Sequence, residues 1–131
     1  MTFATDLDVV HRWCELAAQA AASKKADDIV ILDVGAILAI TDSFVIASAS
    51  NERLVRAITE EIERKIKLSG GPSPRRVEGQ REGEWVLMDF GDFVVHVFLE
   101  ETRRFYDLER LWGDAPRVPW EEEVPAMASG E

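Results

Sequence analysis

The sequence has little of the two residue types that most often build metal centres. It contains one cysteine, Cys14, and two histidines, His11 and His96, among its 131 residues. A single cysteine excludes an internal disulfide and a cysteine-cluster zinc site. Two histidines are too few for a histidine-built metal site without help from carboxylates. We therefore expect no metal site and no cofactor.

Basic residues are scarce relative to acidic ones: 15 Lys and Arg stand against 25 Asp and Glu, a formal net charge of −10. Nucleic-acid affinity rests largely on cationic contacts to phosphates, so this balance argues against direct, specific nucleic-acid binding. It also argues against an anionic membrane surface. No stretch approaches the roughly 20 apolar residues of a membrane span. The first residues lack the basic start and apolar run of a secretory signal, so we expect a cytoplasmic protein.

Motifs of catalysis are missing as well. There is no Gly-x-Ser-x-Gly nucleophile elbow. Asp89-Phe90-Gly91 matches the kinase magnesium motif letter for letter, but the chain is too short for a kinase and lacks its glycine-rich and catalytic loops. Gly70-Gly71 follows a predicted helix instead of opening one, so it is not a phosphate loop. We assign no catalytic residues and do not expect an enzyme.

What is present is a pattern of helices and strands in a chain of single-domain length. Apolar residues recur at helical spacing over residues 6–23 and again over 52–68, where Ser50-Asn51-Glu52 is a helix start signal. Between the helices, apolar runs rich in β-branched residues at 29–34 and 44–49 predict two buried strands. Both strands are expected to be central in the sheet.

The second half of the chain predicts a short edge strand at 75–79, a β-hairpin formed by 84–89 and 92–99, and one or two short helices over 100–112. The element order is then α-β-β-α-β-β-β-α. This order predicts a single α/β domain with a mixed sheet of about five strands packed with helices.

The chain turns polar after Trp112. Residues 113–131 contain several prolines and the run Glu121-Glu122-Glu123. We therefore expect a domain over residues 1–112, followed by an acidic, proline-containing, disordered tail over 113–131.

The predicted hairpin is the most informative segment, because it has apolar side chains on both faces and is rich in aromatic residues: Trp85, Phe90, Phe93 and Phe98. One face covers the helices. The other is either covered by something else or exposed as an apolar patch, which is a feature of interaction sites. The alternative is that Trp85 is a core residue and His96 a satisfied histidine.

The register of the hairpin stays open at this point. A two-residue loop at Phe90-Gly91 pairs Trp85 with His96 and Leu87 with Val94. A three-residue loop with Gly91 in a left-handed bulge pairs Trp85 with Val95 instead.

Several blocks of sequence form a specific combination. They are Asp28–Val34, Ile40–Ala47, Val77-Glu78-Gly79, the hairpin block with Trp85 and Asp89-x-Gly-Asp-x-x-x-His96, and Tyr106-x-Leu-Glu-x-Leu-Trp112. Over roughly residues 27–115 the sequence resembles the ribosomal silencing factor S family, the iojap-like proteins.

This resemblance implies a nucleotidyltransferase-like topology in which catalysis is not the role. It implies a translational repressor that binds the large ribosomal subunit through the subunit's fourteenth protein. Binding there sterically blocks joining of the small subunit under nutrient limitation or in stationary phase. Some members form homodimers, so a homodimer is a further expectation. The alternative function is a nucleotidyltransferase-like enzyme or a nucleotide-binding relic.

The resemblance also assigns roles within the hairpin. Trp85 and Phe90 are the expected apolar anchors, since aromatic residues dominate interface energies. Asp89 and His96 are expected to supply polar contacts. Leu87 and Val94 are expected to fill the patch between them.

Overall fold

The computed structural model describes residues 6–36, 41–107, 110 and 113–122, with side chains from residue 8 onward. Within them the predicted order of elements is confirmed. The elements are α1 (Asp6–Ser23), β1 (Asp27–Asp33), β2 (Ser43–Ala49), α2 (Glu52–Leu68), β3 (Arg76–Glu78), β4 (Trp85–Asp89), β5 (Phe93–Leu99) and α3 (Glu100–Tyr106). The end of the helical segment predicted over 100–112 includes residues 108–109 and 111–112, which lie outside the described residues.

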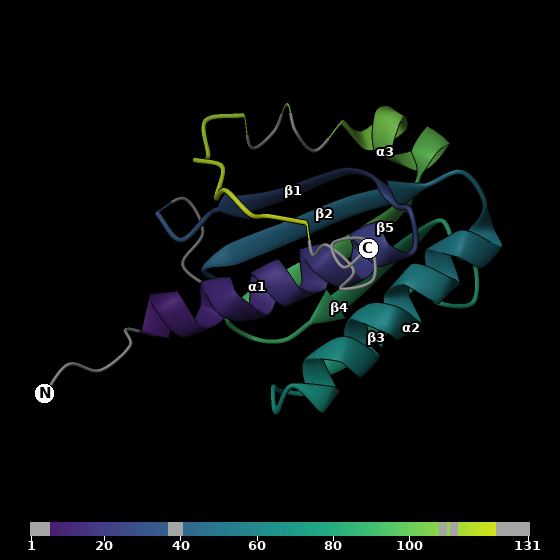
Figure 1. Cartoon of the computed structure of the whole chain (residues 1–131). Helices are drawn as coiled ribbons and strands as arrows, with labels where there is room; N and C mark the ends of the chain where they lie inside the picture. Colours follow the sequence, from purple (N-terminus) through teal and green to yellow (C-terminus); the bar gives the residue numbers. More distant parts are fainter. Residues whose placement is uncertain (1–5, 37–40, 108–109, 111–112, 123–131) are drawn as a thin grey trace, which may run out of the picture.

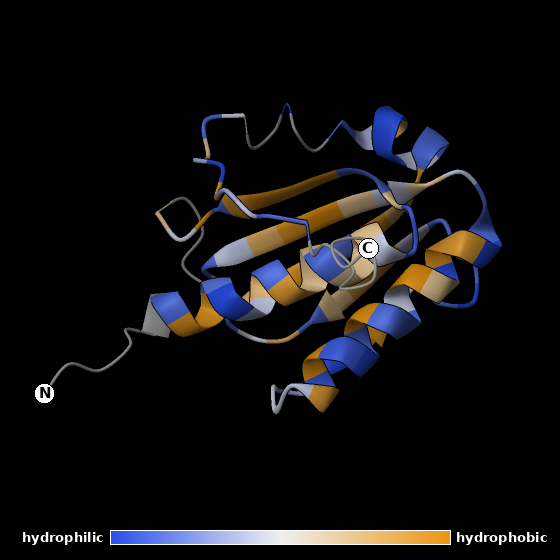
Figure 2. Cartoon of the chain, in the orientation of Figure 1, coloured by the Kyte–Doolittle hydropathy of each residue, from blue (hydrophilic) through white to orange (hydrophobic). Residues whose placement is uncertain are grey.

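The five strands form one mixed sheet in the order β1-β2-β5-β4-β3. β2 and β5 are parallel neighbours, and the other pairs are antiparallel. Figure 1 shows α1 and α2 lying across one face of this sheet, with α3 apart from them. The strands are predominantly hydrophobic along their length in Figure 2, as expected for strands covered on at least one side.

The second helix begins and ends where its sequence predicts. The side chain of Asn51 caps it, because Oδ1 accepts a hydrogen bond from the Leu54 N–H at 2.8 Å. Lys65 and Lys67 stand in the last turn, where cations suit the helix dipole. The apolar stripe faces the sheet and is buried; its members include Val55, Ile58, Ile62 and Ile66. Figure 2 shows the opposite face of this helix as hydrophilic.

The first helix packs closely because its buried face is made of small residues, Ala17, Ala18, Ala20 and Ala21, none of which is exposed. Cys14 lies on the same face and is fully buried. Burial raises the pKa of its thiol to about 12. Because the thiolate is the reactive form, Cys14 is an inert core residue.

The prediction that both early strands are central is wrong for β1, which is at the edge of the sheet. Its outer side is covered by residues 116–118. The Asp33 N–H donates to the Pro116 carbonyl, and the Val118 N–H donates to the Ile31 carbonyl, each at 2.8 Å. This extra pairing explains why the sequence of β1 resembles that of an interior strand.

The segment that covers β1 belongs to the predicted tail. Val118 and Trp120 pack against the core on the helix side of the sheet, and Gln19 of α1 donates to the Glu121 carbonyl at 2.9 Å. Residues 116–121 are therefore part of the packed domain and not of a disordered tail. Their apolar side chains outweigh the prolines and acidic residues around them. The rest of the predicted tail, residues 123–131, lies outside the described residues.

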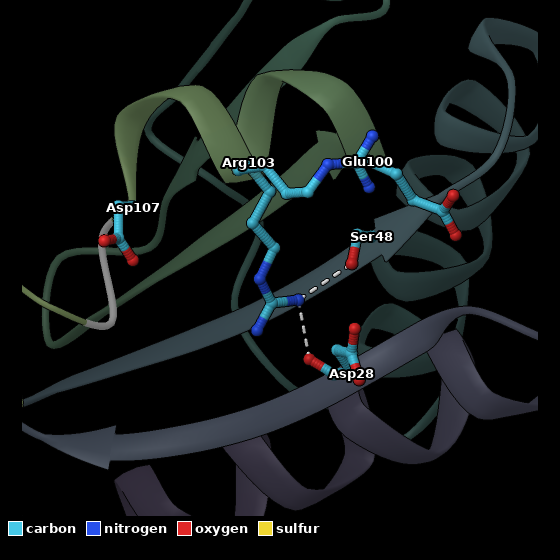
Figure 3. Close-up of a pocket in the computed structure, with 6 residues that line it drawn as sticks. Asp28, Ser48, Glu100, Arg103 and Asp107 are labelled. Atoms are coloured by element: carbon cyan, nitrogen blue, oxygen red, sulfur yellow. Dashed lines mark hydrogen bonds between the residues drawn. The ribbon is translucent and has the colours of Figure 1, made fainter.

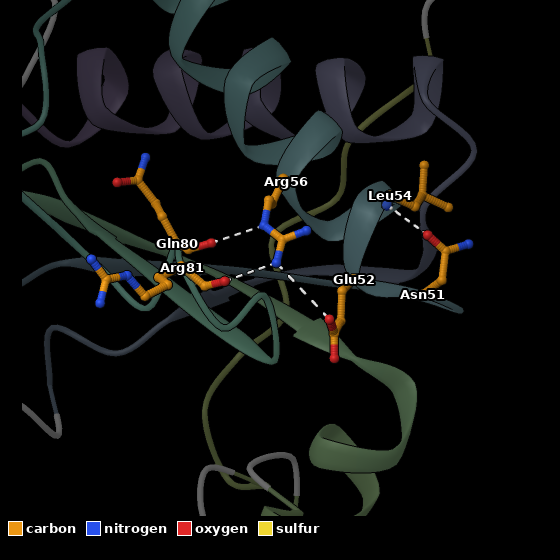
Figure 4. Close-up of polar contacts among 6 residues, drawn as sticks. All are labelled: Asn51, Glu52, Leu54, Arg56, Gln80 and Arg81. Carbon is orange, nitrogen blue, oxygen red and sulfur yellow. Dashed lines mark hydrogen bonds and ion pairs between the residues drawn. The ribbon is translucent and has the colours of Figure 1, made fainter.

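Arg56 of α2 positions the loop that leads into β4 (Figure 4). Its guanidinium donates from Nε to the Gln80 carbonyl at 3.0 Å and from Nη2 to the Arg81 carbonyl at 2.8 Å. Gly79 starts this loop with φ of +87°, and a Cβ there would overlap the carbonyl oxygen of Trp85. The loop is thus closely packed against the residue that begins β4.

A buried arginine ties α3 to the far strands of the sheet (Figure 3). Arg103 is only 7% exposed, and its Nη1 donates to the Asp28 carbonyl at 2.6 Å and to Ser48 Oγ at 2.8 Å. Asp28 has φ of +50° at an irregularity in β1, which turns its carbonyl away from the regular ladder. One side chain therefore joins α3, β1 and β2.

We predict that Arg103→Met lowers the free energy of unfolding by about 2–4 kcal/mol, because it leaves the buried Ser48 Oγ and the partly buried Asp28 carbonyl without their charged donor. Urea denaturation measures the change. Arg104→Met is the matched control, since Arg104 is an exposed neighbour on the same helix. It should change stability by less than about 0.5 kcal/mol. Equal effects of the two substitutions would contradict a structural role for Arg103.

Candidate functional site

One face of the sheet is not covered by α1 and α2. Side chains alternate between the two faces along each strand, so β4 contributes Trp85, Leu87 and Asp89 to this face and β5 contributes Val94 and His96. We call these five residues the open face. Four of them are half-buried, and His96 is 5% exposed. All five are residues for which the sequence predicts partner contacts.

The hairpin has neither of the two registers considered from the sequence. Trp85 pairs with Phe98, and Leu87 pairs with His96. The turn is centred on Gly91-Asp92, one residue later than expected, and Gly91 takes the position with positive φ. Compared with the two-residue loop considered above, the pairing shifts by two residues. A shift of two keeps every side chain on its face, so the composition of the open face is unchanged.

Phe90 does not belong to the open face. It is 7% exposed in the core beneath the helices, and its ring stacks on Phe93 with centroids 4.5 Å apart. It follows Asp89 directly, and alternation therefore turns it to the opposite side. The structure thus separates the two expected anchors, Trp85 and Phe90.

Trp85 and His96 are held together across the hairpin. The indole Nε1–H of Trp85 donates to His96 Nδ1 at 3.1 Å. Two phenylalanine rings flank this pair: the Phe44 ring centroid lies 4.7 Å from that of His96, and the Phe98 ring centroid lies 4.9 Å from that of Trp85. The ring of Tyr106 in α3 also packs against Trp85, with ring centroids 5.0 Å apart. The half-buried indole is therefore held by several neighbours instead of lying loose on the surface.

The hydrogen bond also determines the protonation state of His96. An indole N–H can only donate, so Nδ1 must be the unprotonated acceptor and the neutral ring carries its proton on Nε2. Burial lowers the pKa of His96 to about 4, because the imidazolium would lose its hydration. Nε2 is itself buried and has no hydrogen-bond partner among the described residues. His96 is thus satisfied at only one of its two nitrogens.

Asp89 is held in place by the hairpin turn. Its Oδ1 accepts a hydrogen bond from the Gly91 N–H at 2.8 Å. Its Oδ2 lies 3.8 Å from Arg76 Nη2, and Arg76 is also 3.1 Å from a carboxylate oxygen of Glu78. The carboxylate of Asp89 therefore stabilises the turn and is neutralised in part by the neighbouring strand.

A pocket of about 340 Å³ opens beside Leu87, Val94 and His96. The sequence alone did not single out its other main walls, Thr41, Phe44 and Arg75. Phe44 reaches the pocket because β2 pairs with β5 in parallel, with Phe44 opposite Val94. The alternation of β2 could have indicated which face Phe44 occupies, but the sequence does not reveal that β2 and β5 are neighbours.

The apolar surface continues past Trp85 onto α3. Tyr106 is 49% exposed and Phe105 is 80% exposed. Their rings lie 5.0 Å apart, edge to face. Tyr106 contacts the half-buried Trp85 and Phe105 contacts Tyr106, and adjoining exposed aromatic side chains of this kind are typical of a surface that meets another molecule.

Among the described residues, no group of three or more His, Cys, Asp or Glu side chains could hold a metal ion. In the same part of the chain, no helix is both long enough and apolar enough to cross a membrane. The fold and the open face together define a small α/β domain in which part of one sheet face, around Trp85, Leu87 and Val94, is available for contact with another molecule.

Comparison with known proteins identifies the family. Residues 9–131 match the family described as "Ribosomal silencing factor during starvation", and the chain belongs to this family. The Ribosomal silencing factor RsfS of Halalkalibacterium halodurans is 43% identical over 107 residues, which cover 82% of this chain and 91% of that protein. The resemblance inferred from the sequence is thereby confirmed.

Two further relatives extend this comparison. A crystal structure of a protein from Chromobacterium violaceum matches with a TM-score of 0.75 and 32% identity, covering 89% of this chain and 92% of that one. A mouse protein named "Mitochondrial assembly of ribosomal large subunit protein 1" is 34% identical over 92 residues, which are 68% of this chain and 40% of the mouse protein.

We predict that His96 makes the protein less stable as the pH falls from about 6.5 to about 4. The folded-state pKa lies below that of the unfolded chain, so the unfolded chain binds more protons in this range and gains stability. The expected slope is up to about 1.4 kcal/mol per pH unit. Urea denaturation at several pH values measures it. Because carboxylates titrate in an overlapping pH range, the control is His96→Gln, whose slope of stability against pH should be smaller than that of the wild type. Equal slopes would refute the lowered pKa of His96.

Proposed function

We propose that this chain is a translational repressor that binds the large ribosomal subunit and blocks joining of the small subunit when nutrients are limiting. Membership of the silencing-factor family and the names of the relatives support this role. The protein acts by binding and not by catalysis, and it acts in the cytoplasm.

The open face is the proposed docking surface, and its half-buried apolar side chains are the observation that carries the proposal. Trp85, Leu87 and Val94 present apolar surface at the centre of the face. Asp89 and His96 add polar groups beside them. An apolar centre with a tryptophan anchor is the usual arrangement of a protein interface with a few dominant residues.

We propose the fourteenth protein of the large subunit as the docking partner, as the family resemblance implies. A protein partner agrees with a chain of net charge −10, because the chain does not need to hold RNA phosphates itself. A bound domain at the face of the large subunit that meets the small subunit excludes the small subunit by occupying its place.

Such steric repression requires no chemical step and no conformational change. The blocked fraction of subunits depends only on the free concentration of repressor relative to its Kd. At ten times Kd, about 90% of the subunits are occupied. The cell could therefore set the degree of silencing through the amount of this protein alone.

We predict that Trp85→Ala weakens binding to purified large subunits by about 2 kcal/mol or more, roughly a 30-fold rise in Kd. Co-sedimentation through a sucrose gradient, over a range of protein concentrations, measures the change. Leu87→Asp is a second variant that leaves the hydrogen bond between Trp85 and His96 in place. Leu68→Ala is the control, since Leu68 is 72% exposed at the end of α2, on the helix side.

The outcomes of this experiment are distinct. If the wild-type protein does not sediment with large subunits, the proposed function is wrong. If it does, and both open-face variants bind as tightly as Leu68→Ala with unchanged circular dichroism, docking occurs elsewhere on the molecule.

We propose that a homodimer, where it forms, uses the same open face. Self-association then competes with binding to the ribosome. Sedimentation velocity should show that Leu87→Asp shifts any dimer to monomer, whereas Leu68→Ala does not. Retention of the dimer in Leu87→Asp would place self-association on another surface.

A further inference from the structure

The pocket beside the open face has an imbalance of hydrogen-bonding groups. Its walls are apolar at Phe44, Leu87 and Val94. Its one carboxylate, Asp89, already accepts the Gly91 N–H and lies near Arg76. The acceptor that the pocket offers is therefore engaged within the chain.

The donors of the pocket are not engaged. Thr41 is 7% exposed and His96 is 5% exposed, and neither Thr41 Oγ1 nor His96 Nε2 has a hydrogen-bond partner among the described residues. The indole of Trp85 holds Nδ1 of His96, which leaves a proton on Nε2. Buried polar groups without partners are uncommon in native proteins, and two in one pocket wall indicate that a ligand completes them.

A cation stands at the rim of the same pocket. Arg75 is exposed, and no ion pair engages its guanidinium among the described residues. The guanidinium lies against Gly91, so closely that a Cβ at position 91 would overlap it. Glycine at the hairpin turn therefore allows Arg75 to lie flat beside the pocket. Local positive charge here contrasts with the net charge of −10 of the whole chain.

We propose that this pocket receives a carboxylate side chain, glutamate or aspartate, from the protein that docks on the open face. This inference rests on the proposed function for the identity of the partner, but not for the chemistry of the pocket. The carboxylate takes Arg75 as its charged donor, with Thr41 and His96 as neutral donors. Phe44, Leu87 and Val94 contact the methylene groups of the incoming side chain.

The size and chemistry of the pocket favour this occupant over others. Its volume of about 340 Å³ is at the lower end of ligand sites, which suits a side chain better than a cofactor. A lysine or arginine from the partner would be repelled by the positive charge of Arg75. It would also lack an acceptor, because Asp89 is already engaged within the chain. A purely apolar side chain would leave the buried donors without partners, which costs free energy.

The first test uses the free protein and a pair of small probes with the same shape. The probes are 4-methylpentanoate and its uncharged analogue 4-methylpentanamide, titrated while ¹⁵N-resolved NMR spectra are recorded. The carboxylate should produce saturable shifts at Thr41, Gly91 and the His96 side chain, with a Kd at least about tenfold lower than that of the amide. Arg75→Gln should abolish this preference. Equal shifts with both probes, or no shifts at these residues, would overturn the proposal.

The second test uses complete large subunits. Arg75→Gln should raise the Kd for subunit binding by about tenfold. Arg75→Lys should recover part of the affinity because it keeps the charge without the planar geometry. Arg53→Gln is the matched control, because Arg53 is an exposed arginine of α2. If Arg75→Gln binds as tightly as wild type and Arg53→Gln, the pocket has no role in docking.

The two tests separate the inference from the proposed function. Absence of wild-type co-sedimentation refutes the ribosomal role, whereas the probe titration still decides whether the pocket prefers a carboxylate. Binding of wild type to subunits together with an unaffected Arg75→Gln refutes the inference and leaves the ribosomal role intact.

Discussion

The hydrogen bond from Trp85 to His96 organises the open face of this domain. It joins neighbouring strands of the hairpin through side chains, in addition to the backbone ladder. The rings of Phe98 and Tyr106 also pack against the indole, and the hydrogen bond adds a directional contact to this packing. With it, Trp85 is presented in one orientation, and less conformational entropy is lost when a partner binds. The same bond leaves His96 Nε2 as a donor, so the apolar anchor and the polar pocket share one cause.

The two faces of the sheet have different tasks. Alanines of α1 and the apolar stripe of α2 close one face, and this cluster contains most of the buried hydrophobic residues. The opposite face can then carry half-buried apolar side chains without endangering the fold. Arg56 of α2 holds the loop before β4 by a hydrogen bond to its backbone, and Arg103 holds α3, the helix after β5, against β1. The open face is thus framed by structure on both sides of the hairpin.

Local patterns in the sequence were sufficient for most of the fold. The cap at Asn51 and the apolar stripe define α2. With the two-residue loop, period-two alternation assigns Trp85, Leu87, Asp89, Val94 and His96 to one face although that register is wrong by two. The three-residue loop would have placed Val94 and His96 on the opposite face. The role expected for Phe90 came from the family resemblance and not from alternation, which places Phe90 on the face opposite to Trp85.

Non-local pairing accounts for the other differences. An apolar strand can be at the edge of the sheet if another segment covers it, as residues 116–118 cover β1. Likewise, Thr41 and Arg75 meet at one pocket only because β2 and β5 lie in parallel while β3 closes the sheet beyond β4. Neither relation is encoded in the spacing of residues along the chain.

The covering of β1 also limits how other molecules can recognise this domain. One edge of the sheet is occupied by the chain's own residues 116–118, and the other is β3, a strand of three residues flanked by charged side chains. Neither edge offers a long unpaired ladder for a foreign strand. A partner that binds the sheet must therefore contact the side chains of its face and not the backbone of its edges. Recognition of this kind depends on residue identity at each position, so it can diverge between relatives while the fold stays the same.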